Sequence, residues 1–302
     1  MKNHVKKFPS QEIDRLLMSC KARIGVYLKD LNSGVIYEHA ADDLFPTASI
    51  CKVPVMVELF NQAHQGRISL DDRRRLEGPI SIWGGGMLPL LRNAPEFTLR
   101  DYCLMMIARS EDMATDLLMG VLGLDAINAT MDKLGFQHTR VNMTMGQWHA
   151  LVCDMQGVLC NHENHPQLLK KYYSGHRNWD TVASRGSLKN NVTSPREMGD
   201  IIEKIHLGQI ISGEASAQML DILKKCTSRN MIPRDLQPQV QVAHKIGSGC
   251  GVKGDVGMVY LPSGPLLVSA MLFSKTGGSD WIGDVARLAV QALSPDSVAQ
   301  EQ

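Results

Sequence analysis

Paired cysteines, an excess of charge of either sign and a long apolar run are all missing from this chain of 302 residues. Its seven cysteines are scattered, an odd number with no C-x-x-C pair: Cys20, Cys51, Cys103, Cys153, Cys160, Cys226 and Cys250. Such a set fits neither a disulfide framework nor a zinc site, and it favours reduced thiols. Lys and Arg number 32 against 31 Asp and Glu, which argues against a nucleic-acid partner.

The N-terminus also lacks the apolar segment of an export signal, because the polar run 11–15 follows the first lysines at once. No stretch approaches the length of an apolar membrane span, so no membrane partner is expected. As written, the sequence predicts a cytoplasmic protein, or an exported one if a targeting segment has been removed.

Hydrophobic residues make up 44% of the sequence, enough for a substantial core. Helical spacing of apolar residues and alternating apolar runs between glycine-rich turns predict the helices and strands. We expect helices over residues 10–19, 53–64, 102–108, 113–122, 195–205, 214–226 and 281–293, and strands over 24–28, 35–37, 240–247, 257–261 and 266–273. The pattern is weak between residues 135 and 192, which favours surface loops with short helical pieces.

Strands therefore stand at both ends of the chain, with a helical block between them. The two sets would join into one antiparallel sheet with helices on both sides, and the helical block would form a second lobe.

A serine and a lysine three positions apart, Ser49 and Lys52, precede the apolar run Val53–Val57. If this run opens a helix, the two side chains lie one turn apart on the same face. A neighbouring amine can then take the hydroxyl proton and make the serine a nucleophile. A helix cap followed by a solvated lysine is the simpler interpretation of this common pattern.

Two further polar motifs follow in the chain. Ser110, Glu111 and Asp112 interrupt two apolar helices, and Lys245-Ile246-Gly247 lies in an expected strand. In this order and spacing the three motifs resemble the S-x-x-K, S-D-N and K-T-G set of class A β-lactamases and penicillin-binding proteins.

The resemblance runs from about Ile24 to Leu293 and implies an α+β fold of the β-lactamase/transpeptidase type in a single catalytic domain, 1–302. The α/β lobe would comprise about 10–50 and 195–295. The helical lobe would span about 53–192 and include an extended Ω-loop region, 140–192.

The resemblance also implies roles for four side chains. Ser49 would be acylated and Lys52 would handle its proton, while Ser110 relays a proton to the leaving nitrogen and Lys245 holds the substrate carboxylate.

The backbone amides of Ser49 and Ser248 would form the oxyanion hole, flanked by Gly247 and Gly249. Asp112 stands where the family usually has an asparagine that binds the substrate amide. An aspartate there removes two donors and adds negative charge, which indicates a different substrate or a raised pKa of Asp112.

The Ω-loop region departs further, because Gln147 falls near the position of the glutamate that activates the deacylating water. A neutral amide is a poor base. Either His149 or Glu163 replaces it, or deacylation is slow and the acyl-enzyme is long-lived.

We therefore expect a serine hydrolase that forms an acyl-enzyme at Ser49 and hydrolyses a β-lactam or related small amide. An esterase, peptidase or biosynthetic amidase of the same fold, or an acylated sensor without turnover, remains an alternative. No metal or organic cofactor is expected, since His162 and His165 lack the i, i+4 spacing of a helical zinc site.

Overall fold

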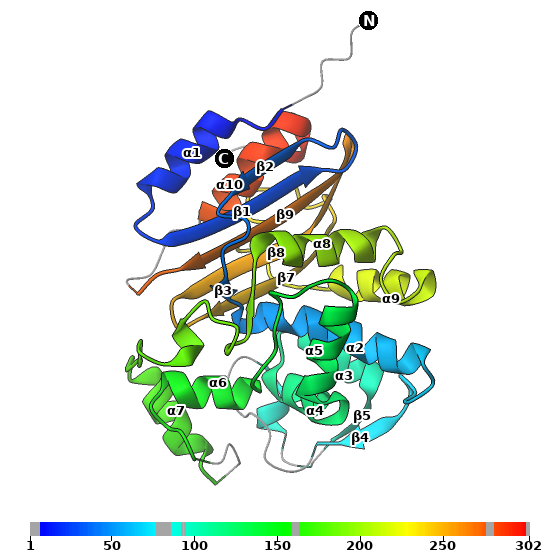
Figure 1. Ribbon diagram of the computed structural model, residues 1–302, viewed down its shortest axis with the longest axis vertical. Coiled ribbons are helices and arrows are strands. Elements are labelled where there is room, and N and C mark those ends of the chain that lie inside the picture. Colours follow the sequence, from blue (N-terminus) through cyan, green and yellow to red (C-terminus); the bar gives the residue numbers. More distant parts are fainter. Residues whose placement is uncertain are drawn as a thin grey trace, which may run out of the picture.

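A five-stranded antiparallel sheet forms the centre of the α/β lobe (Figure 1). The computed structural model describes residues 7–76, 86–91, 93, 95–158, 163–275 and 281–299. The strands are β1 (Arg23–Asp30), β2 (Ile36–His39), β7 (Val242–Gly249), β8 (Val252–Leu261) and β9 (Gly264–Phe273), in the order β2-β1-β9-β8-β7. Strand β1 pairs with β9 over its whole length, so the two ends of the chain meet inside one sheet, as the sequence predicts.

Alternation along β1 assigns its side chains to two separate cores. Val26 and Leu28 face α1 (Ser10–Ser19) and α10 (Trp281–Leu293), and they share a core with the fully buried Trp281. Tyr27, between them, belongs to the core on the opposite face. The period of two is that of a strand buried on both sides. In Figure 1, α1 and α10 lie together beyond the sheet, away from the helical lobe.

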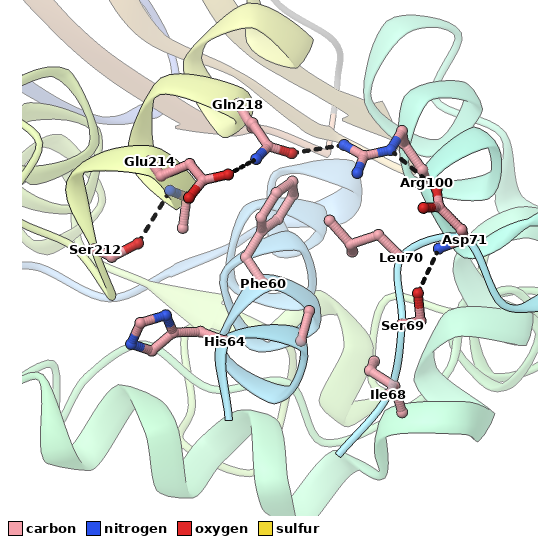
Figure 2. Close-up of a pocket in the computed structure, with 12 residues that line it drawn as sticks. Phe60, His64, Ile68, Ser69, Leu70, Asp71, Arg100, Ser212, Glu214 and Gln218 are labelled. Carbon is pink, nitrogen blue, oxygen red and sulfur yellow. Dashed lines mark hydrogen bonds and ion pairs between the residues drawn. The ribbon is translucent and has the colours of Figure 1, made fainter. Parts of the chain in front are cut away.

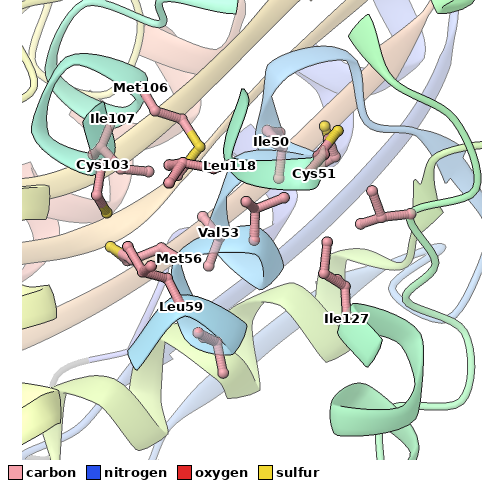
Figure 3. Packing of buried hydrophobic residues seen from close by; sticks show 14 of the residues in the cluster. Ile50, Cys51, Val53, Met56, Leu59, Cys103, Met106, Ile107, Leu118 and Ile127 are labelled. Atoms are coloured by element: carbon pink, nitrogen blue, oxygen red, sulfur yellow. The ribbon is translucent and has the colours of Figure 1, made fainter. Parts of the chain in front are cut away.

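The opposite face of the sheet is covered by α8 (Pro195–His206) and α9 (Gly213–Leu223), and beyond them lies the helical lobe. The lobe is built on α2 (Lys52–His64), whose apolar residues are buried on every side of the helix (Figure 3). A helix that is apolar all round belongs inside a core. The surrounding helices are α3 (Leu99–Ala108), α4 (Asp112–Leu122) and α5 (Leu124–Lys133).

Two short helices, α6 (Met145–Val152) and α7 (His165–Tyr173), lie in the segment whose sequence pattern is weak. The minor elements are the strand pairs β3 (Phe45–Pro46) with β6 (Val192–Thr193) and β4 (Arg73–Arg75) with β5 (Glu96–Thr98), and the 3-10 turns η1 (Ala48–Cys51), η2 (Leu88–Leu90), η3 (Val182–Ser184) and η4 (Pro295–Ser297). None of the helices in the described ranges combines the length and hydropathy needed to cross a bilayer.

The expected fold is confirmed, and several boundaries need correction. Helices α1 and α10 have the predicted bounds. Helix α9 ends at Leu223, so Cys226 lies beyond it, in a turn where its backbone nitrogen donates to Leu223 O at 3.2 Å. Strand β8 begins five residues before the expected Gly257.

Candidate active site

Ser49 lies in the 3-10 turn η1, one step before α2 rather than within it. The preceding Ala48 has φ +43°, a left-handed conformation that is unfavourable for a residue with a Cβ. Such strain persists only where surrounding contacts hold it, and it is often found at functional sites. The turn leaves Ser49 half-buried while Ile50 and Cys51 pack into the core (Figure 3).

Strand β7 lies directly against this turn because Gly247 has no side chain. A Cβ at Gly247 would lie 2.4 Å from the carbonyl oxygen of Thr47 and 3.2 Å from the backbone nitrogen of Ile50. Gly254 on β8 makes a similar close approach to Ile50. The two glycines therefore bring the third motif to the turn that carries Ser49.

Lys52 is fully buried, and its Nζ donates to three oxygens of the second motif. The acceptors are Ser110 O at 2.7 Å, Ser110 Oγ at 3.1 Å and Asp112 Oδ1 at 2.5 Å. Three donated hydrogens are those of an ammonium group. Among the described residues Ser49 is not one of these acceptors, so this geometry is that of a protonated Lys52 held by Asp112 rather than of a base on Ser49.

Ser110 joins the two lysines of the predicted set. Its Oγ lies 3.1 Å from Lys52 Nζ and 3.0 Å from Lys245 Nζ, and its backbone has φ +56°. Burial, assisted by the charge of Lys52, lowers the pKa of Lys245 to about 7. Lys245 therefore titrates near neutrality, as is typical of a functional amine.

Asp112 is buried between Lys52 and His149. Its Oδ2 lies 3.2 Å from His149 Nε2, while Oδ1 accepts from Lys52. Burial alone raises the pKa of Asp112, but the charge of Lys52 and the contacts with His149 outweigh it, so the pKa lies below its usual value. Asp112 is therefore a carboxylate, and the raised pKa considered from the sequence is wrong.

The three candidates for a deacylating group lie in different surroundings. Gln147 is exposed and closes a capping box with Thr144, accepting from its backbone nitrogen at 2.9 Å. Glu163 is exposed before α7. Only His149 of the three is buried in contact with Asp112. On the third motif, Ser248 is exposed and Gly249 is half-buried beside Trp148.

The sequence analysis missed Asp116, which lies one helical turn after Asp112. Its two carboxylate oxygens accept from the backbone nitrogens of Met145 (2.6 Å) and Gly146 (2.9 Å), and this holds the start of α6 against α4. Burial raises the pKa of Asp116 to about 7. An acidic residue within the apolar stretch 113–122 is the sequence signal that marks it.

Glu111 is buried too, and its Oε2 accepts from the backbone nitrogen of Met87 at 2.8 Å. Burial raises the pKa of Glu111. Glu111 therefore anchors the chain at Met87, and it leaves no room for a side chain at Gly86, where a Cβ would lie 1.7 Å from Glu111 Oε2. The glycines before it in the sequence, Gly84 and Gly85, lie outside the described residues.

A separate pocket of about 350 Å³ lies near the far end of α2, where Phe60 and His64 face Arg100 and Gln218 (Figure 2). None of the predicted site residues lines it. Since α2 rises about 1.5 Å per residue, His64 lies roughly 18 Å from Lys52 along the helix. Within the described residues no group of three or more His, Cys, Asp or Glu side chains could hold a metal ion, and His162 lies outside those residues.

The sheet, the helical lobe and the three motifs that meet between them define a protein of the serine β-lactamase-like class. A solved β-lactamase from Sphaerobacter thermophilus is 24% identical, covers 94% of this chain and 96% of its own, and superposes with a TM-score of 0.75. A solved protein called PBP-A is 24% identical over 95% of this chain and 96% of its own, with a TM-score of 0.76.

Among curated sequences, a β-lactamase of Rhodobacter capsulatus is 22% identical over 274 residues, which cover 88% of this chain and 80% of the relative. The model of the β-lactamase enzyme family matches residues 8–293. The chain therefore belongs to the β-lactamase enzyme family. At these identities the solved structures show the fold alone.

Proposed function

We propose that this protein is a serine hydrolase in which Ser49 attacks the carbonyl of a β-lactam or related amide and forms an acyl-enzyme. The observation that carries the proposal is the position of Ser110 Oγ, which lies within hydrogen-bonding distance of both Lys52 Nζ and Lys245 Nζ. A hydroxyl between two amines is suited to passing a proton to a leaving nitrogen.

In this mechanism the proton of Ser49 leaves through Lys52 and Ser110. Lys52 first has to pass one proton through Ser110 Oγ to a neutral Lys245, and its ion pair with Asp112 opposes this transfer. Lys245, when protonated, holds the carboxylate of the substrate. The amides of Ser49 and Ser248 support the developing oxyanion.

His149 is our candidate for the group that supports deacylation. It is the imidazole of α6, and Asp112 orients it through Nε2. A carboxylate that orients a histidine is a common arrangement in acyl-transfer enzymes. Gln147, by contrast, uses its amide oxygen to cap α6.

The relatives support lactam chemistry. The curated relatives are themselves β-lactamases, and a variant of PBP-A was solved as an acyl-enzyme complex with penicillin G. Gln147 is exposed and its side chain caps α6, so it is poorly placed to activate a water. This favours an alternative in which deacylation is slow and the acyl-enzyme persists.

The direct test is incubation with penicillin G followed by intact-protein and peptide mass spectrometry. Opening of the lactam ring releases no leaving group, so the expected adduct on Ser49 has the full mass of penicillin G. Ser49→Ala should carry none. The proposal is wrong if neither penicillin G nor a fluorophosphonate modifies Ser49 in folded protein.

The lifetime of the adduct then separates the alternatives. His149→Gln should extend it by about 100-fold if His149 assists deacylation, since general-base catalysis contributes on that order. A single burst without steady-state turnover indicates an acylated sensor. Turnover of a nitrophenyl ester without lactam turnover indicates an esterase.

A further inference from the structure

A second cluster of titratable groups lies outside the Ser49 site, at the end of α9 and on β7 and β8. The thiol of Cys226 is hydrogen-bonded to the imidazole of His244. His244 Nδ1 lies 2.8 Å from Asp255 Oδ1, and the side chains of His244 and Cys226 line the same cavity. Asp255 is held in turn, because its Oδ2 accepts from the backbone nitrogen of Ile232 at 3.0 Å. The proposed hydrolysis uses none of these side chains.

The register of β7 and β8 places His244 and Asp255 close together. His244 and Asp255 lie diagonally across the β7–β8 ladder and therefore on the same face of the sheet. The partner of His244 in the register is Gly257, where a Cβ would lie 2.3 Å from the His244 Cβ. His244 and Asp255 are buried, and burying such a charged pair is costly unless it is well hydrogen-bonded.

Cys226 is half-buried and lines a cavity of about 280 Å³ together with His244. Lys224 and Arg229 lie on the wall of the same cavity. A small polar reagent therefore has access to the sulfur.

The charges that face Cys226 favour its thiolate. Burial raises the pKa of the thiol, but the hydrogen bond and charge of His244, together with Lys245, outweigh burial and the charge of Asp255, so the pKa lies below its usual value. Burial lowers the pKa of His244, and Asp255 and Cys226 more than reverse this, to about 10. These contacts favour a thiolate at Cys226 beside an imidazolium at His244.

We propose that Cys226, His244 and Asp255 form a second reactive centre, a modification site at which the thiolate of Cys226 reacts with hydrogen peroxide. The sulfur attacks one peroxide oxygen, an S–O bond forms and the O–O bond breaks. The departing hydroxide takes the proton of the His244 imidazolium and leaves as water. Sulfur is oxidised by two electrons to the sulfenic acid, the peroxide is reduced, and His244 ends neutral.

The chain provides its own control in Cys250. It is half-buried like Cys226, but burial raises its pKa to about 11. The unmodified protein is treated with hydrogen peroxide at pH 6.5 in the presence of dimedone, which traps sulfenic acids, and the adduct at each cysteine is quantified by peptide mass spectrometry. Cys226 should be trapped at least about tenfold faster than Cys250, because the thiolate is the reactive form.

His244→Gln removes the imidazolium and should slow trapping at Cys226 about tenfold without changing Cys250. Circular dichroism and the melting temperature establish that the variant is folded. If it does not fold, the pH profile of the unmodified protein decides, since trapping at Cys226 should persist at a lower pH than at Cys250. Equal rates at the two cysteines, or an unchanged rate in folded His244→Gln, would overturn the proposal. Neither readout depends on the chemistry of Ser49.

Discussion

The contact between Lys52 and Asp112 determines the resting state of the Ser49 site. The 2.5 Å separation and the burial of both side chains hold the lysine as an ammonium. An ammonium cannot accept the proton of Ser49, so the proposed acylation requires Lys52 to lose a proton first, which the ion pair with Asp112 opposes. In the proposed mechanism the carboxylate of Asp112 is therefore expected to slow acylation.

Asp112→Asn tests this role. The amide can still accept from Lys52 Nζ but carries no charge, so we expect acylation by penicillin G to become about tenfold faster at pH 7, because the ion pair that restrains Lys52 is lost. The free energy of unfolding should fall by about 3 kcal/mol, since a buried ion pair loses one partner. Single-turnover mass spectrometry and urea denaturation measure the two effects.

Asp125→Asn, an exposed acid on α5, is the control and should change neither quantity measurably. Slower acylation in Asp112→Asn would instead mean that the carboxylate itself takes part in binding or proton transfer. This outcome would contradict the restraining role.

Single residues also show what the sequence can predict. Ser110 and Lys245 were found from motif order alone, and the structure brings their side chains to 3.0 Å. The functional roles of these residues remain predictions. The capping role of Gln147 has a local signal that the sequence analysis missed, the T-x-x-Q spacing of Thr144 and Gln147, whereas the acceptor role of Asp116 depends on where α6 packs.

Helix α6 is the element that links the helical lobe to the site, because it carries His149. Its first turn is held from two sides, by its own capping box at Thr144 and by Asp116 of α4. Apolar periodicity does not predict this helix because it is only eight residues long. The sequence predicts too short a strand β8, because Gly254 and Gly257 are weak strand formers. Both glycines are present here because the neighbouring residues pack too closely for a side chain.

Asp116→Ala should lower the free energy of unfolding by about 2 kcal/mol, because the amides of Met145 and Gly146 lose a buried acceptor. Amide hydrogen exchange of residues 145–152 should accelerate. Exposed Asp221→Ala on α9 is the control and should change the free energy of unfolding by less than about 0.5 kcal/mol. Unchanged exchange in α6 would contradict the anchoring role.

The effect of Asp116→Ala should also depend on pH. The folded pKa of Asp116 is about 7, against 3.8 as the ordinary value, so between these values the folded protein keeps a proton that the unfolded chain releases. The contribution of Asp116 to stability is complete below the lower value and declines as pH rises to 7. The loss in the variant should therefore be larger at pH 5 than at pH 8.

At the scale of the whole molecule, the sheet separates two hydrophobic cores, one beneath α1 and α10 and one around α2. The core beneath α1 and α10 lies on the face of the sheet away from the helical lobe, whereas the core around α2 includes Ile50 and Cys51 of the turn that carries Ser49. The presence of a sheet joining both chain ends could be predicted because its strands are long and apolar. The small pair β3–β6 could not, since two residues per strand leave no periodic signal.

Val285→Ala on α10 and Val53→Ala on α2 test this division, since both valines are fully buried. Each should lower the free energy of unfolding by about 2 kcal/mol through the loss of two methyl groups and the cavity left behind. Only Val53→Ala should slow acylation of Ser49 in the folded protein. Equal slowing in Val285→Ala would show that the two cores are not independent.

The pairing of β1 with β9 sets the order in which the molecule can be completed during synthesis. Strand β1 leaves the ribosome early. Its partner β9 is complete only when the chain has been made as far as Phe273. Ser49 and Lys245 are likewise brought together only when β7 has docked. Contacts between such distant segments form slowly. A nascent chain that stops before β9 therefore holds all three motifs while one edge of β1 is still unpaired, and such an edge is prone to pair with other chains.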